Sequence, residues 1–260
     1  MEYIFSYVTT EGAVRKVNQD SLFIITAVFK GQSILFAAVC DGVGGMAQGE
    51  NASGFVCWRL TEWFKSDFSD MMKNSASVLK IRESLDECLH NVNDRINNYA
   101  DRTNTSMGTT VTAVLIIPQL ERMLTAHAGD SRLYRISDSD TEILTADHSI
   151  VGQEVRNGKL TEEMAETDSR QNQLTNCIGG GLTDSSYDYS ISEYKLNECY
   201  MICSDGFRKK LSRSEIQGRL CPSVNCDENS MAGNLEFLKN KVMSCGEKDN
   251  ITAVLVKIRN

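Results

Sequence analysis

Acidic residues stand repeatedly at the ends of apolar stretches of this sequence. Asp41 and Asp205 each follow such a stretch directly, and Asp249 comes two residues before the last one. Asp20 precedes another stretch, and Asp130 falls between two. Taken singly, each is most simply a turn residue, because Asp-Gly and Gly-Asp are favoured loop dipeptides. Five such placements in one chain instead indicate a shared site.

Carboxylates gathered in one place repel one another, and they remain ionised only if cations lie between them. Oxygen-rich sites of this kind suit Mg²⁺ or Mn²⁺ better than zinc. The glycines of Asp41-Gly42-Val43-Gly44-Gly45 let the backbone approach closely, so the carbonyl of Gly42 could join the ligands. The sequence therefore predicts a centre of hard divalent cations.

Two simpler interpretations compete with parts of this site. Gly129-Asp130 has the composition of a two-residue hairpin loop, which would make Asp130 a turn residue. The segment 42–47 fits the Gly-x-Gly-x-x-Ala pattern of a dinucleotide-binding turn. The strands that follow it are joined as hairpins and build no βαβ units, which argues against dinucleotide binding.

The elements that must position these residues can be read from the hydrophobic pattern. Runs rich in β-branched and aromatic residues predict strands, and several turns between them are too short for a crossover helix, so the sheets should be mostly antiparallel. Helices grouped between such strands indicate an α+β layered domain. The expected strands cover about 3–8, 21–29, 33–40, 108–117, 122–128, 131–136, 198–204 and 250–258. The expected helices cover about 48–66, 75–101, 147–157, 161–166, 212–220 and 229–243.

Charge and composition exclude several classes of function. The 27 Lys and Arg residues against 35 Asp and Glu give a net charge of −8, which repels nucleic acids and anionic membranes. No apolar stretch reaches the ~18 residues needed to span a bilayer, and we expect no signal peptide. The nine cysteines include no Cys-x-x-Cys pair, so we expect reduced thiols in a cytoplasmic protein.

Seven short segments, in this order and at this spacing, resemble those of a known family. They are Arg15-Lys16-Val17-Asn18-Gln19-Asp20, Asp41-Gly42-Val43-Gly44-Gly45, Met107-Gly108-Thr109-Thr110, Gly129-Asp130-Ser131-Arg132, Asp147-His148-Ser149, Ser204-Asp205-Gly206-Phe207 and Asp249-Asn250-Ile251-Thr252. The chain thus resembles the metal-dependent protein serine/threonine phosphatases of the protein phosphatase 2C type, the PPM family, in its bacterial branch. The resemblance extends over residues 15 to 252, nearly the whole chain.

This resemblance implies a fold, an activity and partners. The fold would be α+β, a four-layer α-β-β-α sandwich of two mostly antiparallel sheets flanked by helix pairs. Residues 1–260 would form one catalytic domain, with a flap insertion at about 146–173. The activity would be hydrolysis of phosphoserine and phosphothreonine by a hydroxide that bridges two Mg²⁺ or Mn²⁺ ions. Its partners would be phosphorylated proteins that are substrates of a cognate serine/threonine kinase. The protein would be a cytoplasmic monomer.

The alternative is a catalytically silent regulatory or binding module on the same fold. Inactive relatives usually lack one or more of the metal aspartates, whereas this chain keeps Asp41, Asp205 and Asp249.

The resemblance also implies a role for each acidic position. Asp41 would bridge two tightly bound metal ions, and Asp205 and Asp249 would complete one of them. The carbonyl of Gly42 would bind the other ion, with Asp20 as its support, directly or through water.

Two further positions match, and two depart from the family pattern. Asp130 would hold a third, weaker ion, and Arg15 would grip phosphate oxygens with its planar fork. Gln19 stands where eukaryotic members carry a Glu that contributes to the second metal, so that metal would lean on Asp20. Val43 replaces a histidine proposed as general acid, which leaves water at the metals as the proton donor.

Overall fold

The described part of the chain forms twelve strands and a set of mostly short helices. The structure, a computed structural model, describes residues 1–182 and 185–259, so residues 183–184 and 260 of the predicted domain lie outside the described residues. The strands are β1 (Glu2–Thr10), β2 (Ser21–Phe29), β3 (Gln32–Cys40), β4 (Gly108–Thr109), β5 (Val111–Ile117), β6 (Arg122–Ala128), β7 (Arg132–Ile136), β8 (Thr141–Ile143), β9 (Ile178–Gly179), β10 (Asp188–Ser192), β11 (Cys199–Cys203) and β12 (Ile251–Arg259). The helices are α1 (Gly49–Trp63), the π-helical turn η1 (Phe64–Phe68), α2 (Ser69–Lys73), α3 (Val78–Thr103), the 3-10 turn η2 (Pro118–Leu120), α4 (Ile150–Arg156), α5 (Glu162–Thr167), α6 (Asp205–Arg208), α7 (Arg213–Leu220) and α8 (Glu228–Ser244).

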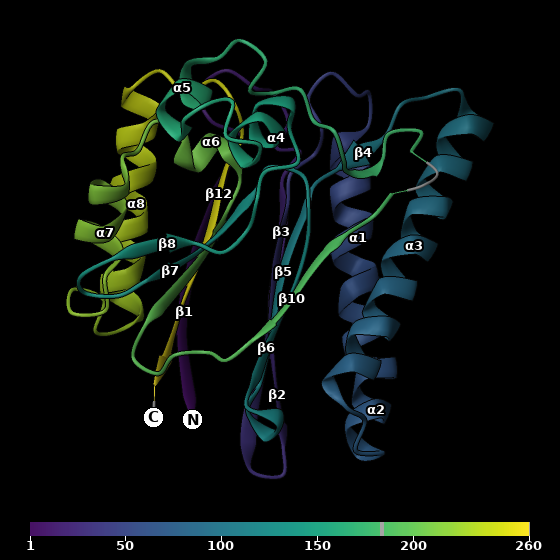
Figure 1. Cartoon of the computed structure of the whole chain (residues 1–260), viewed down its shortest axis with the longest axis vertical. Helices are drawn as coiled ribbons and strands as arrows, with labels where there is room; N and C mark the ends of the chain where they lie inside the picture. Colours follow the sequence, from purple (N-terminus) through teal and green to yellow (C-terminus); the bar gives the residue numbers. More distant parts are fainter. Residues whose placement is uncertain (183–184, 260) are drawn as a thin grey trace.

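Two five-stranded sheets lie face to face between two groups of helices (Figure 1). The first sheet has the strand order β1-β12-β11-β7-β8, and the second has the order β10-β6-β5-β3-β2. Their strand pairings are antiparallel throughout the described residues. Helices α7 and α8 cover the first sheet, and α1 and α3 cover the second. The predicted α+β sandwich of four layers is confirmed.

Three clusters of buried side chains join these four layers. In β3, Leu35, Ala37 and Val39 face the first sheet, whereas Phe36 and Ala38 face α1 and α3. A strand buried on both faces has no polar side to alternate with, which explains the unbroken apolar run that predicted it. The third cluster lies between the outer face of the first sheet and the helices α7 and α8.

The elements that the pattern missed are short or polar. Strands β8 and β9 have three and two residues, and β10 is a five-residue strand at the edge of its sheet. The predicted strand 108–117 is divided, because the amide of Thr110 donates to the carbonyl of Asp41 at 2.8 Å and leaves the ladder. The first predicted helix continues past residue 66 through η1 into α2.

The topology decides two of the simpler interpretations. Gly129-Asp130 does not close a hairpin: β6 pairs with β5 and β10, whereas β7 pairs with β11 and β8. The segment 129–131 therefore crosses from one sheet to the other, and the hairpin interpretation is wrong. The dinucleotide interpretation fails as well, because β3, which precedes the glycine-rich turn, pairs antiparallel with both of its neighbours.

All nine cysteines are free thiols, and seven of them are buried. Across residues 1–182 and 185–259, no helix is both long and apolar enough to cross a membrane.

Candidate active site

The five predicted aspartates come together at one end of the sandwich, and both sheets contribute to them. Asp20 and Asp41 lie where β2 begins and β3 ends, side by side in the second sheet. Asp205 and Asp249 lie where β11 ends and β12 begins in the first sheet. Asp130 lies on the crossing between the sheets. The charges of the other four each raise the pKa of Asp41, which places them near its carboxylate.

Burial dominates the electrostatics of this cluster. It raises the pKa of Asp41 well above its usual range, and repulsion from Asp20 and Asp205 adds to the effect. Burial likewise raises the pKa of Asp20 to about 7, and burial together with the charge of Asp205 raises that of Asp130 to about 7. Burial alone would also raise the pKa of Asp205, but the charge and hydrogen bond of Lys209 lower it. The protein therefore supplies too little positive charge to neutralise its own carboxylates.

Backbone contacts hold Asp41 in place. Its amide donates to Thr110 Oγ1 at 2.9 Å, and its carbonyl accepts from Thr109 Oγ1 at 2.9 Å. The next residue, Gly42, lies against Gln19, and a Cβ on Gly42 would come within 2.8 Å of the Gln19 carbonyl oxygen. Only glycine fits there, so the close approach expected of this turn is present.

A second close contact of the backbone lies at this end of the first sheet, between Gly206 and Asn250. A Cβ on Gly206 would lie 2.1 Å from the carbonyl oxygen of Asn250, so glycine is required directly after Asp205. The side chain of Asn250 accepts from the amide of Gln19 at 2.9 Å and donates to the carbonyl of Val17 at 3.0 Å. Asn250 thus ties the first sheet to the loop that carries Asp20.

The donor set fits a hard divalent cation. Both carboxylate oxygens of Asp20 are buried and have no hydrogen-bond partner among the described residues, and such orphaned oxygens are costly unless a cation compensates them. Within the described residues, no three His, Cys, Asp or Glu side chains stand at metal-ligand spacing as they are arranged. Two of the aspartates hold protein cations instead: Asp205 pairs with Lys209, and Asp249 pairs with Arg15 at 3.1 Å. Metal binding therefore requires these cations to turn away.

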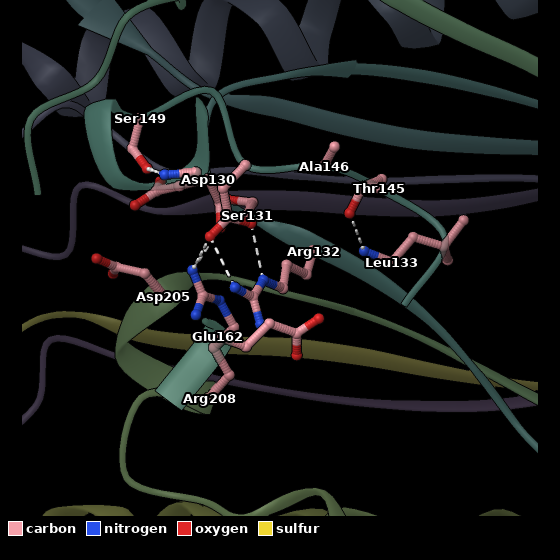
Figure 2. A network of polar contacts seen from close by, with 12 residues as sticks. Asp130, Ser131, Arg132, Leu133, Thr145, Ala146, Ser149, Glu162, Asp205 and Arg208 are labelled. Carbon is pink, nitrogen blue, oxygen red and sulfur yellow. Dashed lines mark hydrogen bonds and ion pairs between the residues drawn. The ribbon is translucent and has the colours of Figure 1, made fainter. Parts of the chain in front are cut away.

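A second buried network supports the crossing segment from behind. Arg132 from β7 and Arg208 from α6 lie close together beside Asp130 and Ser131 (Figure 2). Both guanidinium groups bind the carboxylate of Asp147, Arg132 at 2.7 and 2.8 Å and Arg208 at 3.0 Å. Arg208 also donates to the carbonyl of Asp130 at 3.0 Å. The network fixes the backbone of Asp130.

Sequence reasoning missed three kinds of contact at this site. Thr109, Thr110 and Asn250 stand in the matching segments, but sequence reasoning did not predict that they hold the aspartates in place. It missed Lys209 altogether, although Lys209 lies four residues after Asp205, the spacing at which side chains meet on a helix. It noted Gln19 only as a departure from the family's glutamate, whereas the side-chain amide of Gln19 donates to Glu50 of α1 at 2.9 Å.

Comparison with known proteins identifies the family. A sequence model of the protein phosphatase 2C family matches residues 12–239, which include every predicted site residue except Asp249. The chain belongs to the protein phosphatase 2C family. It is 32% identical over 250 residues to a putative protein phosphatase 2C-type of Streptococcus pyogenes, a match that covers 95% of this chain and 94% of that protein.

Solved structures of this family superpose on nearly the whole chain. The serine/threonine phosphatase Stp1 of Staphylococcus aureus has a TM-score of 0.84 at 25% identity, over 100% of this chain and 96% of that one. The catalytic domain of the phosphatase PstP, solved with two manganese ions, has a TM-score of 0.77 at 24% identity over 100% of both chains, and so shares the fold. The predicted family, fold and enzyme class are confirmed: the protein is a serine/threonine phosphatase of the protein phosphatase 2C type.

Proposed function

We propose that this protein phosphatase 2C family member hydrolyses phosphoserine and phosphothreonine in proteins with Mg²⁺ or Mn²⁺ ions held by its aspartate cluster. The observation that carries the proposal is the buried, orphaned carboxylate of Asp20 beside Asp41, whose charge the protein does not neutralise. A protein that bound no cation there would gain stability by replacing these carboxylates with neutral side chains.

The residues have distinct parts in holding two ions tightly. Asp41 would contribute to both, Asp205 and Asp249 would complete one, and the Gly42 carbonyl with Asp20 would complete the other. Asp130 would hold a third, weaker ion. Bound ions of this kind supply Lewis acidity, which activates water and offsets the charge of the transferring phosphoryl group.

Phosphate binding and the positioning of Asp41 depend on other residues of the chain. Arg15 lies at the rim, with 42% of its side chain exposed, and can exchange its ion pair with Asp249 for a phosphate group. Thr109 and Thr110 hold the backbone of Asp41 in place as charge develops near it. The side chain of Val43 has no acidic proton to donate, so the leaving serine or threonine oxygen takes its proton from water.

Metal removal tests this function. In excess EDTA, dephosphorylation of phosphoserine and phosphothreonine peptides should stop, and added Mn²⁺ or Mg²⁺ should restore it. Phosphotyrosine peptides serve as the comparison for substrate class. Full activity in EDTA would contradict the mechanism. No turnover of p-nitrophenyl phosphate at saturating Mn²⁺ would favour the catalytically silent module.

On the same basis we propose one catalytic domain over residues 1–260, with the segment 146–173 as a flap. Its base is closed by the bridge between Ser149 and Leu174 and by the hydrogen bond of the Ile150 amide to the Gln173 carbonyl at 3.0 Å. We also propose a cytoplasmic monomer that opposes a serine/threonine kinase. Light scattering after gel filtration tests the monomer directly.

A further inference from the structure

A pocket of about 250 Å³ lies under the segment 146–173, next to the network of Asp147. Strands β7 and β8 form one wall, α4 and α5 form the roof, and the residues from Arg208 to Ile216 close the third side. As far as the described residues show, none of the five clustered aspartates lines it. It is therefore a hollow distinct from the phosphatase site.

The pocket is positive in a protein that is negative as a whole. Among the side chains that the structure describes, five arginines or lysines and two carboxylates line it, whereas the chain carries a net charge of −8. The cations come from different elements: Arg132 from β7, Arg156 from α4, and Arg208, Lys209 and Arg213 from α6 and the residues after it. This local excess of positive charge favours an anionic ligand.

The deepest of these cations have one ion-paired carboxylate between them. Arg132 and Arg208 share Asp147, and their side chains are only 20% and 8% exposed. The charges of Asp130 and Asp205 also act on Arg208, although no ion pair joins them to it among the described residues. The Nε–H of Arg208 is buried without a hydrogen-bond partner among the described residues. This unused donor is costly to bury, and an anion that accepts its hydrogen bond would offset that cost.

The rest of the wall is apolar. Ile143, Val151, Val155, Leu211 and Ile216 line the pocket together with these cations. A simple inorganic ion would leave this surface in contact with water, whereas a ligand with an apolar body would cover it.

We propose that this pocket binds a small organic anion, an aromatic ring or branched chain that carries one acid group. Arg156, Arg208 and Lys209 hold the acid group, and the apolar wall holds the body. The enclosed volume suits a ligand about the size of a benzoate ion.

Lys209 connects this pocket to the phosphatase site. Its Nζ donates to Asn172 Oδ1 at 2.6 Å and also contacts the carboxylate of Asp205. An anion in the pocket draws Lys209 away from Asp205 and so frees that carboxylate for a metal ion. This consequence rests on the proposed role of Asp205. Because coupling between two sites is reciprocal, a bound metal ion tightens anion binding by the same factor.

Calorimetric titration of the metal-free protein with benzoate and benzamide tests the pocket, because the two probes differ mainly in charge. Benzoate should bind, and benzamide should bind at least about tenfold more weakly. Failure of benzoate to bind at ~10 mM, or equal affinity for both probes, would overturn the proposal.

Three variants locate the binding site. Val155→Phe fills the pocket and should abolish benzoate binding, and Arg156→Gln should weaken it about threefold. Lys159→Gln is the matched control, an exposed cation on the same segment that does not line the pocket, and it should bind as the wild type does. Equal weakening in both charge variants would show unspecific attraction and refute the site. Because Arg156 is exposed, its variant keeps the test valid if Val155→Phe does not fold.

A titration with Mn²⁺ tests the coupling. Saturating benzoate should raise the affinity for Mn²⁺ about fivefold or more in the wild type and leave it unchanged in Val155→Phe. Unchanged affinity in the wild type would overturn the coupling through Lys209. Failure of Mn²⁺ to bind in either condition would contradict the proposed function instead, and the benzoate titration would still decide the pocket.

Discussion

Two buried clusters of charge lie on either side of the crossing segment, and they are built in opposite ways. Around Asp41 the carboxylates outnumber the nearby cations, and burial raises the pKa values of Asp20, Asp41 and Asp130. Around Asp147 two guanidinium groups face one carboxylate; burial would raise its pKa, but the two arginines lower it to about 2. In the second cluster, the protein's own cations stabilise the central carboxylate. In the first cluster, the negative charge is neutralised only when cations bind. Such an arrangement does not stabilise the fold and therefore indicates a functional site.

Loss of a carboxylate should therefore have opposite consequences in the two clusters, and Asp41→Asn should show the largest effect. We expect turnover to fall at least ~1,000-fold, because the residue shared by both proposed ions is lost. The free energy of unfolding of the metal-free variant should not fall, since repulsion from its neighbours is relieved.

Steady-state kinetics at saturating Mn²⁺ and urea unfolding in EDTA measure the two quantities. Asp205→Asn and Asp249→Asn should lower turnover in the same direction. Wild-type turnover in any of the three would show that its carboxylate is not a ligand.

Asp147→Asn should lower stability instead. Removal of the charge leaves the guanidinium groups of Arg132 and Arg208 buried without a counter-ion, which should cost ~3 kcal/mol of unfolding free energy. Asp168→Asn is the control, because Asp168 pairs with Arg170, whose side chain is 40% exposed, and it should cost less than ~1 kcal/mol. Urea unfolding measures the loss of unfolding free energy in both variants. Equal losses would show that the buried network stabilises the fold no more than the surface ion pair does.

The pH dependence of stability sharpens the same contrast. The pKa of Asp147 is about 2 in the folded protein and ~3.9 in an unfolded chain, so the unfolded chain binds the proton more readily. Its contribution of ~2–3 kcal/mol is fully present above about pH 4 and is lost as the pH falls toward 2. The stability difference between wild type and Asp147→Asn should shrink over that window, and a difference independent of pH would refute the assignment.

Asp130→Ala should have the smallest effect. If Asp130 holds a weaker third ion, turnover of phosphopeptides should fall about tenfold or less, while two Mn²⁺ ions still bind tightly. Its stability should change by no more than ~1 kcal/mol, since Arg208 contacts the backbone carbonyl rather than the side chain. Calorimetric metal titration beside kinetics measures both, and unchanged Mn²⁺ binding together with unchanged turnover would leave Asp130 a purely structural residue.

The sequence predicted the layers and the aspartates because both leave strong local patterns. Strand β3 shows as an unbroken apolar run, and Asp41 follows it at a glycine-rich turn. Contacts made between distant segments left no such pattern. The ion pairs of Asp147 with Arg132 and Arg208 join residues up to 61 positions apart, and nothing in their spacing predicts that they meet. The hairpin interpretation of Gly129-Asp130 failed for the same reason: local composition does not reveal which sheet the next strand joins.

The division of the aspartates between the sheets also has a consequence for folding. Asp20 and Asp41 belong to one sheet, Asp205 and Asp249 to the other, and the segment 129–131 is all that separates β6 of one from β7 of the other along the chain. A folding intermediate with only one sheet formed holds half of the site. After dilution from urea, activity therefore cannot return before the two sheets dock. The rate at which turnover recovers thus reports the docking of the two sheets during folding.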